Sequence, residues 1–378
     1  MIGRRVLATL QRFRYFGCPL LHMKTLPSLF ASALLVLMPL PSRAQLPPER
    51  LPADQFDVTP PSEWVQGPLA RMSVLGGGCR AVPMAGVRRR IVDIAIQEWA
   101  FFGYPVLDRL NGARLLPGAA LRSGRVRFEN TTRRAPTPSA REGERVAATI
   151  AGYWAVTPEG SGIVNAQARR WDQRGAGVRW NAPWSAAFIS WVMCEGGLGT
   201  RDQFRRAIAH WTYVDQAIQA RDGAGTRAGY VAYDVGEEAV EPGDLLCSGR
   251  RPQYRNLAER RAQMGEGASS HCDIVVEVDQ GGERILAVGG NVLRAVSLKV
   301  LPARRGPDGE LFAERSSSVP LFAHLKLRSA PIGLRALRDS RVLAALAGDG
   351  DRSTPSPASR VLEALGVDGP WTSVEVGR

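Results

Sequence analysis

Lysine, histidine and recognisable cofactor motifs are scarce in this sequence. It has only three lysines (Lys24, Lys299 and Lys326) and four histidines. The cysteines and histidines match no metal-binding spacing, and the glycine triplet at residues 76–78 lacks the neighbours of a phosphate-binding loop. Basic and aromatic residues do not alternate in the stripe that is typical of nucleic-acid binding. We therefore expect no cofactor, no metal and no nucleic-acid partner.

Acidic residues are missing from residues 1–44, which carry six basic ones. The formal net charge of the chain is +13, so the remaining residues have a net charge of +7. A modest basic excess suits contact with an anionic polymer such as a cell wall. The hydrophobic content of 44% and the charged content of 22% are ordinary for a globular protein with a sizeable core.

The N-terminus has the pattern of a targeting segment. Lys24 precedes an apolar run at residues 26–40, and the small residues Ser42 and Ala44 fit cleavage before Gln45. The run is too short to span a bilayer comfortably. We expect a signal peptide over residues 1–44 with a start at Met23, a periplasmic or secreted protein, and no stable membrane span after cleavage. An uncleaved anchor is the alternative.

Four cysteines follow the predicted signal peptide: Cys79, Cys194, Cys247 and Cys272. An even number in an exported protein permits two disulfides. Because Cys247 and Cys272 each fall in a predicted strand, we favour that pair. Buried free thiols are the other interpretation.

The hydrophobic periodicity predicts helices first and strands afterwards, which indicates an α+β fold with a small antiparallel sheet. We expect an extended lead-in at 45–89, a domain at 90–330 with an insertion at 104–142, and a helix with a disordered tail at 331–378. The predicted helices cover residues 90–102, 144–155, 185–194 and 201–220. The predicted strands cover residues 230–235, 244–248, 272–278 and 284–288.

A serine begins the most apolar of these helices. Ser185 follows Pro183 and Trp184, and an apolar run continues from Ala186. The unpaired N–H groups and the positive dipole end of a helix start can stabilise an oxyanion beside such a hydroxyl. The pattern therefore makes Ser185 a candidate nucleophile. A serine that only caps the helix is the simpler interpretation.

A predicted hairpin brings His271 and Asn291 together. The turn signal at residues 279–282 lies midway between them, and positions equidistant from a turn lie opposite each other in antiparallel strands. His271 would be the general base for Ser185, and Asn291 would orient its imidazole. Asp273, two residues along the strand from His271, is a substitute for Asn291 in that role. A structural His271 is the alternative, and His210 is expected to pack on its helix beside Trp211.

Five stretches occur in a fixed order between residues 90 and 302: EWAFFG at 98–103, PWSAAFIS at 183–190, PGDLLC at 242–247, SHCDIV at 270–275 and GGNV at 289–292. Together they resemble the bacterial domain of unknown function 2272 family. That family is similar to the papain-like CHAP and NlpC hydrolases, many of which cut amide bonds in peptidoglycan. Ser185 stands where those enzymes carry a nucleophilic cysteine, and a serine needs a true general base.

The resemblance implies a papain-like fold and cell-wall amide hydrolysis. The sequence thus predicts an exported hydrolase that cleaves peptidoglycan amide bonds through Ser185, His271 and Asn291, with a cell-envelope polymer as partner. A non-catalytic envelope-binding module on the same scaffold is the alternative. A secreted toxin is a third interpretation, although no delivery domain or immunity partner is visible.

Overall fold

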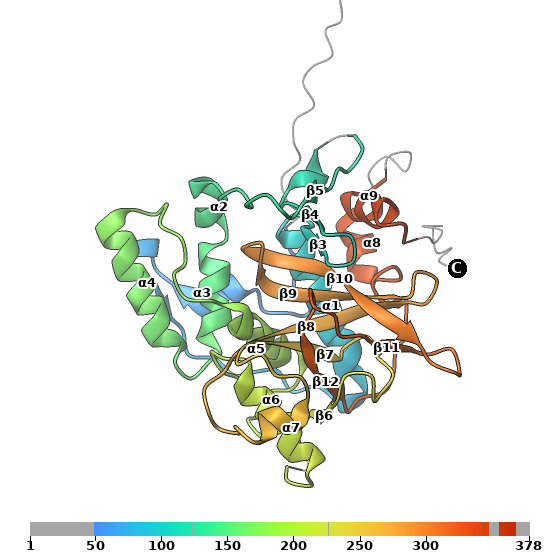
Figure 1. Cartoon of the computed structure of the whole chain (residues 1–378). Helices are drawn as coiled ribbons and strands as arrows, with labels where there is room; N and C mark the ends of the chain where they lie inside the picture. The colour runs from blue at the N-terminus through green and yellow to red at the C-terminus, as the bar shows by residue number, and fades with distance from the viewer. Residues whose placement is uncertain (1–48, 123, 226, 348–354, 368–378) are drawn as a thin grey trace, which may run out of the picture. The chain divides into compact units, whose positions relative to one another are not determined.

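The computed structural model describes residues 49–122, 124–225, 227–347 and 355–367 (Figure 1). The predicted signal peptide, with its start at Met23, lies outside the described residues, as do residues 348–354 and 368–378 of the segment predicted as a helix and tail. In the described ranges, no helix combines the length and the apolar character that crossing a membrane requires.

A ten-stranded sheet forms the centre of the described chain, in the order β5-β4-β3-β10-β9-β8-β7-β12-β6, with β11 paired to β10. Every neighbouring pair is antiparallel except β10 and β3, which are parallel. The α+β class is confirmed, but the sheet is larger than predicted. The strands are β3 (Val106–Asp108), β4 (Ala113–Leu115), β5 (Glu129–Asn130), β6 (Tyr230–Tyr233), β7 (Leu245–Arg251), β8 (Ser269–Asp279), β9 (Arg284–Val292), β10 (Ala295–Arg305), β11 (Leu311–Ala313) and β12 (Leu321–Leu327).

Strands β8 and β9 form the hairpin that the sequence predicts. Ile274 pairs with Val288, which is the register expected from the turn position. Nearly all of β8 is buried, because helices cover one face of the sheet and a second apolar cluster around Leu246 and Val275 covers the other. A strand covered on both faces reads as a nearly continuous apolar run, which explains the pattern at residues 274–278, where Glu277 is the exception.

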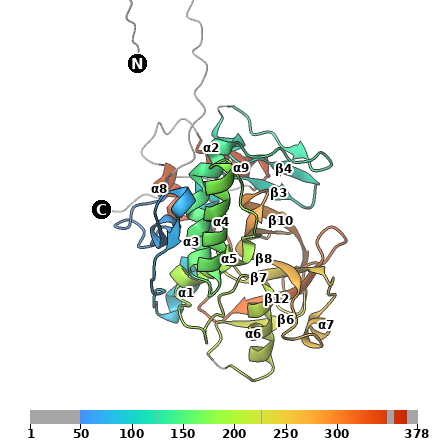
Figure 2. The same ribbon diagram turned by 90° about the vertical axis from the view of Figure 1, so that its left-hand side faces the viewer.

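Helices α1 and α5 lie directly against the sheet, and α3 and α4 lie outside α5 (Figures 1 and 2). Helix α5 is apolar on all sides, and every residue from Ala186 to Gly196 is buried. It is therefore the central helix of the core. The helices are α1 (Met84–Phe101), α2 (Ala140–Arg145), α3 (Ala147–Ala155), α4 (Gly160–Arg174), α5 (Ser185–Gly196), α6 (Trp211–Arg221), α7 (Leu257–Arg261), α8 (Arg341–Ala347) and α9 (Pro357–Ala364).

Residues 104–142 are not an insertion outside the sheet, as the sequence suggested. They contribute β3, β4 and β5, and β3 pairs with β10 across almost two hundred residues of chain. The helix predicted from residue 201 begins only at Trp211, because residues 201–210 form turns. Helix α4 was not predicted, since its sequence is largely polar with two glycines in its first turn.

The lead-in folds against the core rather than extending from it. Two short antiparallel strands, β1 (Val65–Gln66) and β2 (Ser73–Val74), pair within it. The buried Arg50 guanidinium forms an ion pair with Glu98 of α1. Disulfides join Cys79 to Cys194 and Cys247 to Cys272, so the favoured pairing is confirmed.

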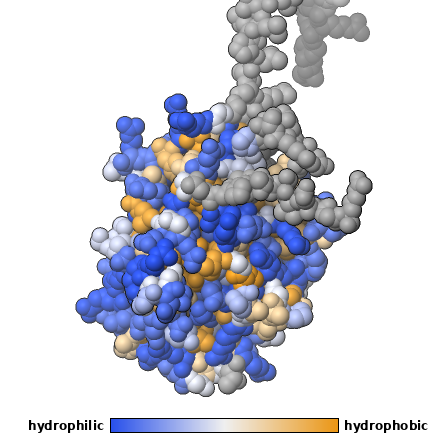
Figure 3. Space-filling view, turned by 90° about the vertical axis from the view of Figure 1, so that its right-hand side faces the viewer, coloured by the Kyte–Doolittle hydropathy of each residue, from blue (hydrophilic) through white to orange (hydrophobic). Residues whose placement is uncertain are grey.

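The described surface carries few large apolar side chains. The face in Figure 3 is mostly hydrophilic, with apolar residues in scattered groups. Among the described residues, only Leu75, Leu110 and Ile208 are large hydrophobic residues with more than a third of their surface exposed. The apolar content of the sequence is therefore used mainly inside the fold.

Candidate active site

Ser185 is the first residue of α5, and it does not cap the helix. Trp184 holds the capping position without a side-chain cap bond, and the first helical hydrogen bond runs from the Phe188 N–H to the Trp184 carbonyl at 3.0 Å. The N–H groups of Ser185, Ala186 and Ala187 therefore have no partner within the helix. Ser185 itself is partly exposed, so its hydroxyl lies at the boundary between the core and solvent.

The Ser185 hydroxyl bonds instead to a histidine that the sequence did not select. Ser185 Oγ lies 2.7 Å from Nε2 of His210, which is almost fully buried. Nδ1 of His210 accepts a hydrogen bond from the backbone N–H of Cys272 at 3.2 Å and also bonds the Tyr213 hydroxyl. The interpretation of His210 as a side chain that only packs beside Trp211 therefore misses its main contact.

These partners fix the tautomer of His210. A backbone N–H can only donate, so Nδ1 is an acceptor and the ring proton lies on Nε2. Burial, followed by the nearby His271, lowers the pKa of His210 well below its ordinary value, so the ring is neutral. Nε2–H consequently donates to Ser185 Oγ. The hydroxyl proton of Ser185 is left free for another acceptor.

His271 has the opposite arrangement. Its Nε2 lies 2.8 Å from Asp273 Oδ1, and the second carboxylate oxygen accepts from Lys299 at 2.5 Å. Burial by itself would raise the pKa of Asp273, but Lys299 and His271 outweigh it and hold that pKa below its usual range. Burial lowers the pKa of His271 although Asp273 opposes this effect. A neutral His271 therefore donates from Nε2. Its buried Nδ1 has no hydrogen-bond partner among the described residues and keeps a free lone pair.

The two imidazoles belong to one cluster, since their ring centroids are 5.2 Å apart. Glycines allow this close packing. A Cβ at position 289 would lie 2.0 Å from Asp273 Oδ1, and one at position 290 would lie 2.6 Å from the Phe188 Cβ. Only glycine lets β9 approach both the His271–Asp273 pair and α5 so closely. The Gly289-Gly290 motif thus has a packing role.

Asn291 does not reach His271, although the hairpin register behind that expectation is correct. Its φ of +56° leaves the extended conformation, and a bulge follows in the pairing of β9 with β10. Among the described residues its side chain makes no hydrogen bond, and it lines a pocket together with Trp184. Asp273, the substitute that the strand alternation offered, takes the position next to the imidazole.

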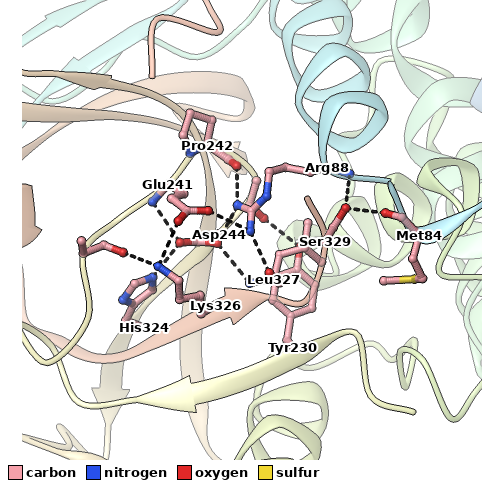
Figure 4. Close-up of polar contacts among 12 residues, drawn as sticks. Met84, Arg88, Tyr230, Glu241, Pro242, Asp244, His324, Lys326, Leu327 and Ser329 are labelled. Carbon is pink, nitrogen blue, oxygen red and sulfur yellow. Dashed lines mark hydrogen bonds and ion pairs between the residues drawn. The ribbon is translucent and has the colours of Figure 1, made fainter. Parts of the chain in front are cut away.

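The Pro242-Gly243-Asp244 motif builds a different, structural cluster (Figure 4). The buried Asp244 accepts hydrogen bonds from Arg88 at 3.0 Å, from His324 at 2.9 Å and from the Leu327 N–H at 3.0 Å. These contacts join α1 to β7 and β12. Across the described ranges, no group of three His, Cys, Asp or Glu side chains is arranged to hold a metal ion.

Sequence reasoning missed three members of the site: His210, Tyr213 and Lys299. The spacing of His210 and Tyr213 places them one helical turn apart, which hints at a local contact. No pattern linked either residue to Ser185, because the turns at residues 201–210 set that contact. Lys299 is one of only two lysines beyond the predicted signal peptide. Its burial, which marks it as a partner of a buried carboxylate, is visible only in the structure.

Neither the curated proteins nor the solved structures gave a match to this chain. Residues 144–320 match the family model described as an uncharacterized protein conserved in bacteria (DUF2272). The matched segment includes Ser185, His210, His271 and Asn291, and four of the five motifs that carried the resemblance; the EWAFFG stretch lies before it. Over residues 144–320, the match therefore supports the family that the motifs indicate.

Proposed function

We propose that this chain is an exported hydrolase that cleaves an amide bond in peptidoglycan, with Ser185 as nucleophile and His271 as general base. The observation that carries the proposal is the free Nδ1 of a neutral His271, oriented by Asp273, in the same cluster as a hydroxyl at a helix start. Asp273 replaces Asn291 as the orienting residue in this proposal.

The proposed reaction has two steps. Ser185 Oγ attacks the amide carbonyl while its proton passes to Nδ1 of His271, directly or through one water, and then to the leaving amine. Water hydrolyses the resulting ester by the reverse proton path. Asp273 stabilises the imidazolium, and the unpaired N–H groups at the start of α5 stabilise the oxyanion. His210 is a positioning residue that holds Oγ through its Nε2–H.

The same proposal includes a papain-like fold and a periplasmic or secreted location. A central helix that begins with the nucleophile and packs on an antiparallel hairpin carrying the base is the arrangement expected of a papain-like hydrolase. The targeting pattern and the net charge of +7 beyond it suit an exported protein that meets an anionic wall polymer. These features support the substrate class but do not identify the bond.

One observation favours the non-catalytic alternative. Ser185 makes its side-chain hydrogen bond with His210, and no hydrogen bond joins it to His271 among the described residues. A serine held by a donor, without direct contact to its base, also fits a binding module that has lost hydrolysis. In that case the groove beside Ser185 would hold a wall peptide without cutting it.

The test compares soluble products from purified sacculi by mass spectrometry. The chain beginning at Gln45 is used as wild type, as Ser185→Ala and as Ser161→Ala, which removes an exposed hydroxyl on α4. We expect fragments from wild type and Ser161→Ala only, with masses that name the bond. Release by Ser185→Ala would disprove the nucleophile, whereas sacculus binding without release from any form would support the binding module.

A further test asks whether the scaffold accepts thiol chemistry. Ser185→Cys should retain or increase fragment release, because a thiolate is a stronger nucleophile than a serine hydroxyl. Inactivity of a folded Ser185→Cys protein, together with an active wild type, would argue against a papain-like mechanism and leave a serine mechanism in place.

A further inference from the structure

A pocket of about 210 Å³ opens beside the residue that precedes Ser185. The end of α1, the α2–α3 region, the segment before α5 and the turn between β9 and β10 enclose it. The residues that line it include Phe102, Trp180, Trp184, Arg179 and Arg294. Trp184 lines it and directly precedes Ser185, so the pocket adjoins the proposed nucleophile along the chain.

The inner wall of the pocket is aromatic. Trp184 and Phe102 are buried and stack with ring centroids 5.9 Å apart and an angle of 23° between the rings. Trp180 adds a partly exposed indole. Rigid aromatic surfaces of this kind bind apolar side chains and the apolar faces of sugars with little loss of conformational entropy.

The rim carries positive charge that the protein leaves unpaired. The carboxylate of Glu142 is neutralised by Arg145, with both of its oxygens 2.8 Å from guanidinium nitrogens. Arg179 and Arg294 are exposed, and neither side chain bonds or ion-pairs with any described residue. Two free guanidinium groups beside an aromatic wall match a ligand that has a carboxylate next to an apolar group.

The turn that carries Arg294 is built against local preference. Leu293 and Arg294 form the two-residue connection between β9 and β10, with φ values of +52° and +62°. Such turns favour Asn and Gly at these positions, because a side chain there is strained. Strained residues gather at functional sites, where their position matters more than their conformational cost. The turn therefore holds Arg294 at the pocket although its positive φ is unfavourable for a residue with a side chain.

We propose that this pocket is a recognition subsite for a free peptide carboxylate, held by Arg179 and Arg294 with its neighbouring apolar group on the partly exposed Trp180, in front of the buried rings of Trp184 and Phe102. The inference rests on the proposed function, since it makes the pocket the substrate-binding side of the same site. It specifies the substrate as a peptide cut close to a terminal carboxylate.

The experiment measures binding by calorimetry in the Ser185→Ala protein, so that no hydrolysis is needed. The probes are acetyl-D-alanyl-D-alanine as the free acid, the same peptide as its C-terminal amide, and inorganic phosphate. We expect the free acid to bind about tenfold more tightly than the amide, since a charge-assisted bidentate contact is lost with the amide. Equal affinity for the two peptides would overturn the proposal, and so would phosphate binding as tightly as the acid.

Variants identify the residues responsible. Arg294→Gln and Arg179→Gln should each remove most of the preference for the acid, and Arg294→Lys should restore only part of it. Arg255→Gln, which changes an exposed arginine on the α7 side of the molecule, is the matched control and should keep the preference. Arg294→Gly gives a form that suits the turn, so a loss of preference there cannot be blamed on misfolding.

The outcome separates the two proposals. If the acid preference and its dependence on Arg294 are found but sacculi yield no fragments, the carboxylate subsite stands and the hydrolase proposal fails. If fragments are released through Ser185 but the acid and the amide bind equally, the hydrolase proposal stands and the subsite fails.

Discussion

At the residue scale, the two histidines of the site differ in that His210 has partners at both ring nitrogens, whereas His271 has one ring nitrogen without a partner among the described residues. His210 is an acceptor at Nδ1 and a donor at Nε2 toward Ser185, whereas His271 donates from Nε2 to Asp273 and keeps Nδ1 free. A neutral imidazole accepts a proton only through its free lone pair. The geometry therefore gives the roles of base and positioning residue to different rings, and substitution should distinguish them.

Asp273→Asn tests which residue orients the base. An amide at this position can present its NH₂ group to Nε2, which favours the wrong tautomer of His271, so we expect kcat to fall by about 10²–10⁴-fold. Asn291→Ala should change kcat by less than about threefold, because Asn291 lies at the pocket rather than at the imidazole. The rates of fragment release from sacculi measure both effects. A larger loss for Asn291→Ala than for Asp273→Asn would reverse the assignment.

His210→Phe tests the positioning role. Without the donor at Nε2, the Ser185 hydroxyl loses its orientation, and we expect kcat to fall by about tenfold to a hundredfold. His210→Gln, which can still donate, should recover part of the loss. The pH profile of kcat should remain that of His271 in both variants. Disappearance of the acid limb in His210→Gln would instead make His210 the base, because glutamine does not titrate.

The pH dependence of the reaction follows from burial of the base. Burial lowers the pKa of His271, and only its neutral form accepts a proton, so the active form persists below the ordinary histidine pKa of about 6.5. Activity should be level through neutral pH and fall only at lower pH. The pH profile of kcat/KM for wild type measures this decrease on the acid side, its acid limb. An acid limb above pH 6.5 would contradict the assignment of His271.

At the scale of secondary-structure elements, the turn between β9 and β10 links stability to binding. Arg294→Gly relieves a residue at φ +62°, so we expect the free energy of unfolding to rise by up to about 1 kcal/mol. Arg294→Ala removes the same side chain without relieving the backbone and should give no such gain. Urea unfolding of the two variants measures the difference. Equal stability of Gly and Ala at this position would show that the turn is unstrained.

Local patterns predicted the elements that carry Ser185 and His271, but not their neighbours. Helix α5 and the β8–β9 hairpin have strong apolar periodicity and a clear turn, so their existence and register could be predicted. The parallel pairing of β3 with β10 joins distant residues, and no local signal reports such a contact. The same holds for His210, whose contact with Ser185 depends on the path of residues 201–210. The contact between His210 and Ser185 therefore becomes visible only in the folded structure.

At the scale of the whole molecule, contacts of two arginine side chains attach the C-terminal segment to the sheet. Arg338 pairs with the buried Glu277 of β8 at 2.5 Å, and Arg284 of β9 donates to the carbonyl of Leu365 at 2.7 Å and to that of Gly366 at 2.8 Å. The segment after β12 thus covers the end of the hairpin whose other end carries His271. Its attachment depends on a carboxylate in an apolar environment, which makes stability depend on pH.

Burial raises the pKa of Glu277 to about 7, although Arg338 opposes this shift. The folded protein therefore holds a proton that the unfolded chain has released above its ordinary pKa of about 4.3. This contribution to stability is complete at low pH and is lost as the pH rises toward 7, by at most about 1.4 kcal/mol per pH unit. The partly buried Asp93, whose pKa burial raises to about 6, acts in the same direction.

Between pH 5 and pH 7 the buried neutral histidines His210 and His271 act in the opposite direction, so the two carboxyls are tested by the change in slope that each substitution causes. We expect Glu277→Gln to make the slope of the free energy of unfolding against pH more positive than in wild type. Adding Asp93→Asn should shift the slope further in the same direction, because the two carboxyls lie on different elements and should act independently. Urea unfolding at half-unit pH steps measures the slopes. The neutral amide keeps the shape of the protonated acid, so a loss of folding would not mask the result. If Glu277→Gln left the slope unchanged, Glu277 would be ionised in the folded protein between pH 5 and pH 7, and the ion pair with Arg338 would attach the segment throughout this range.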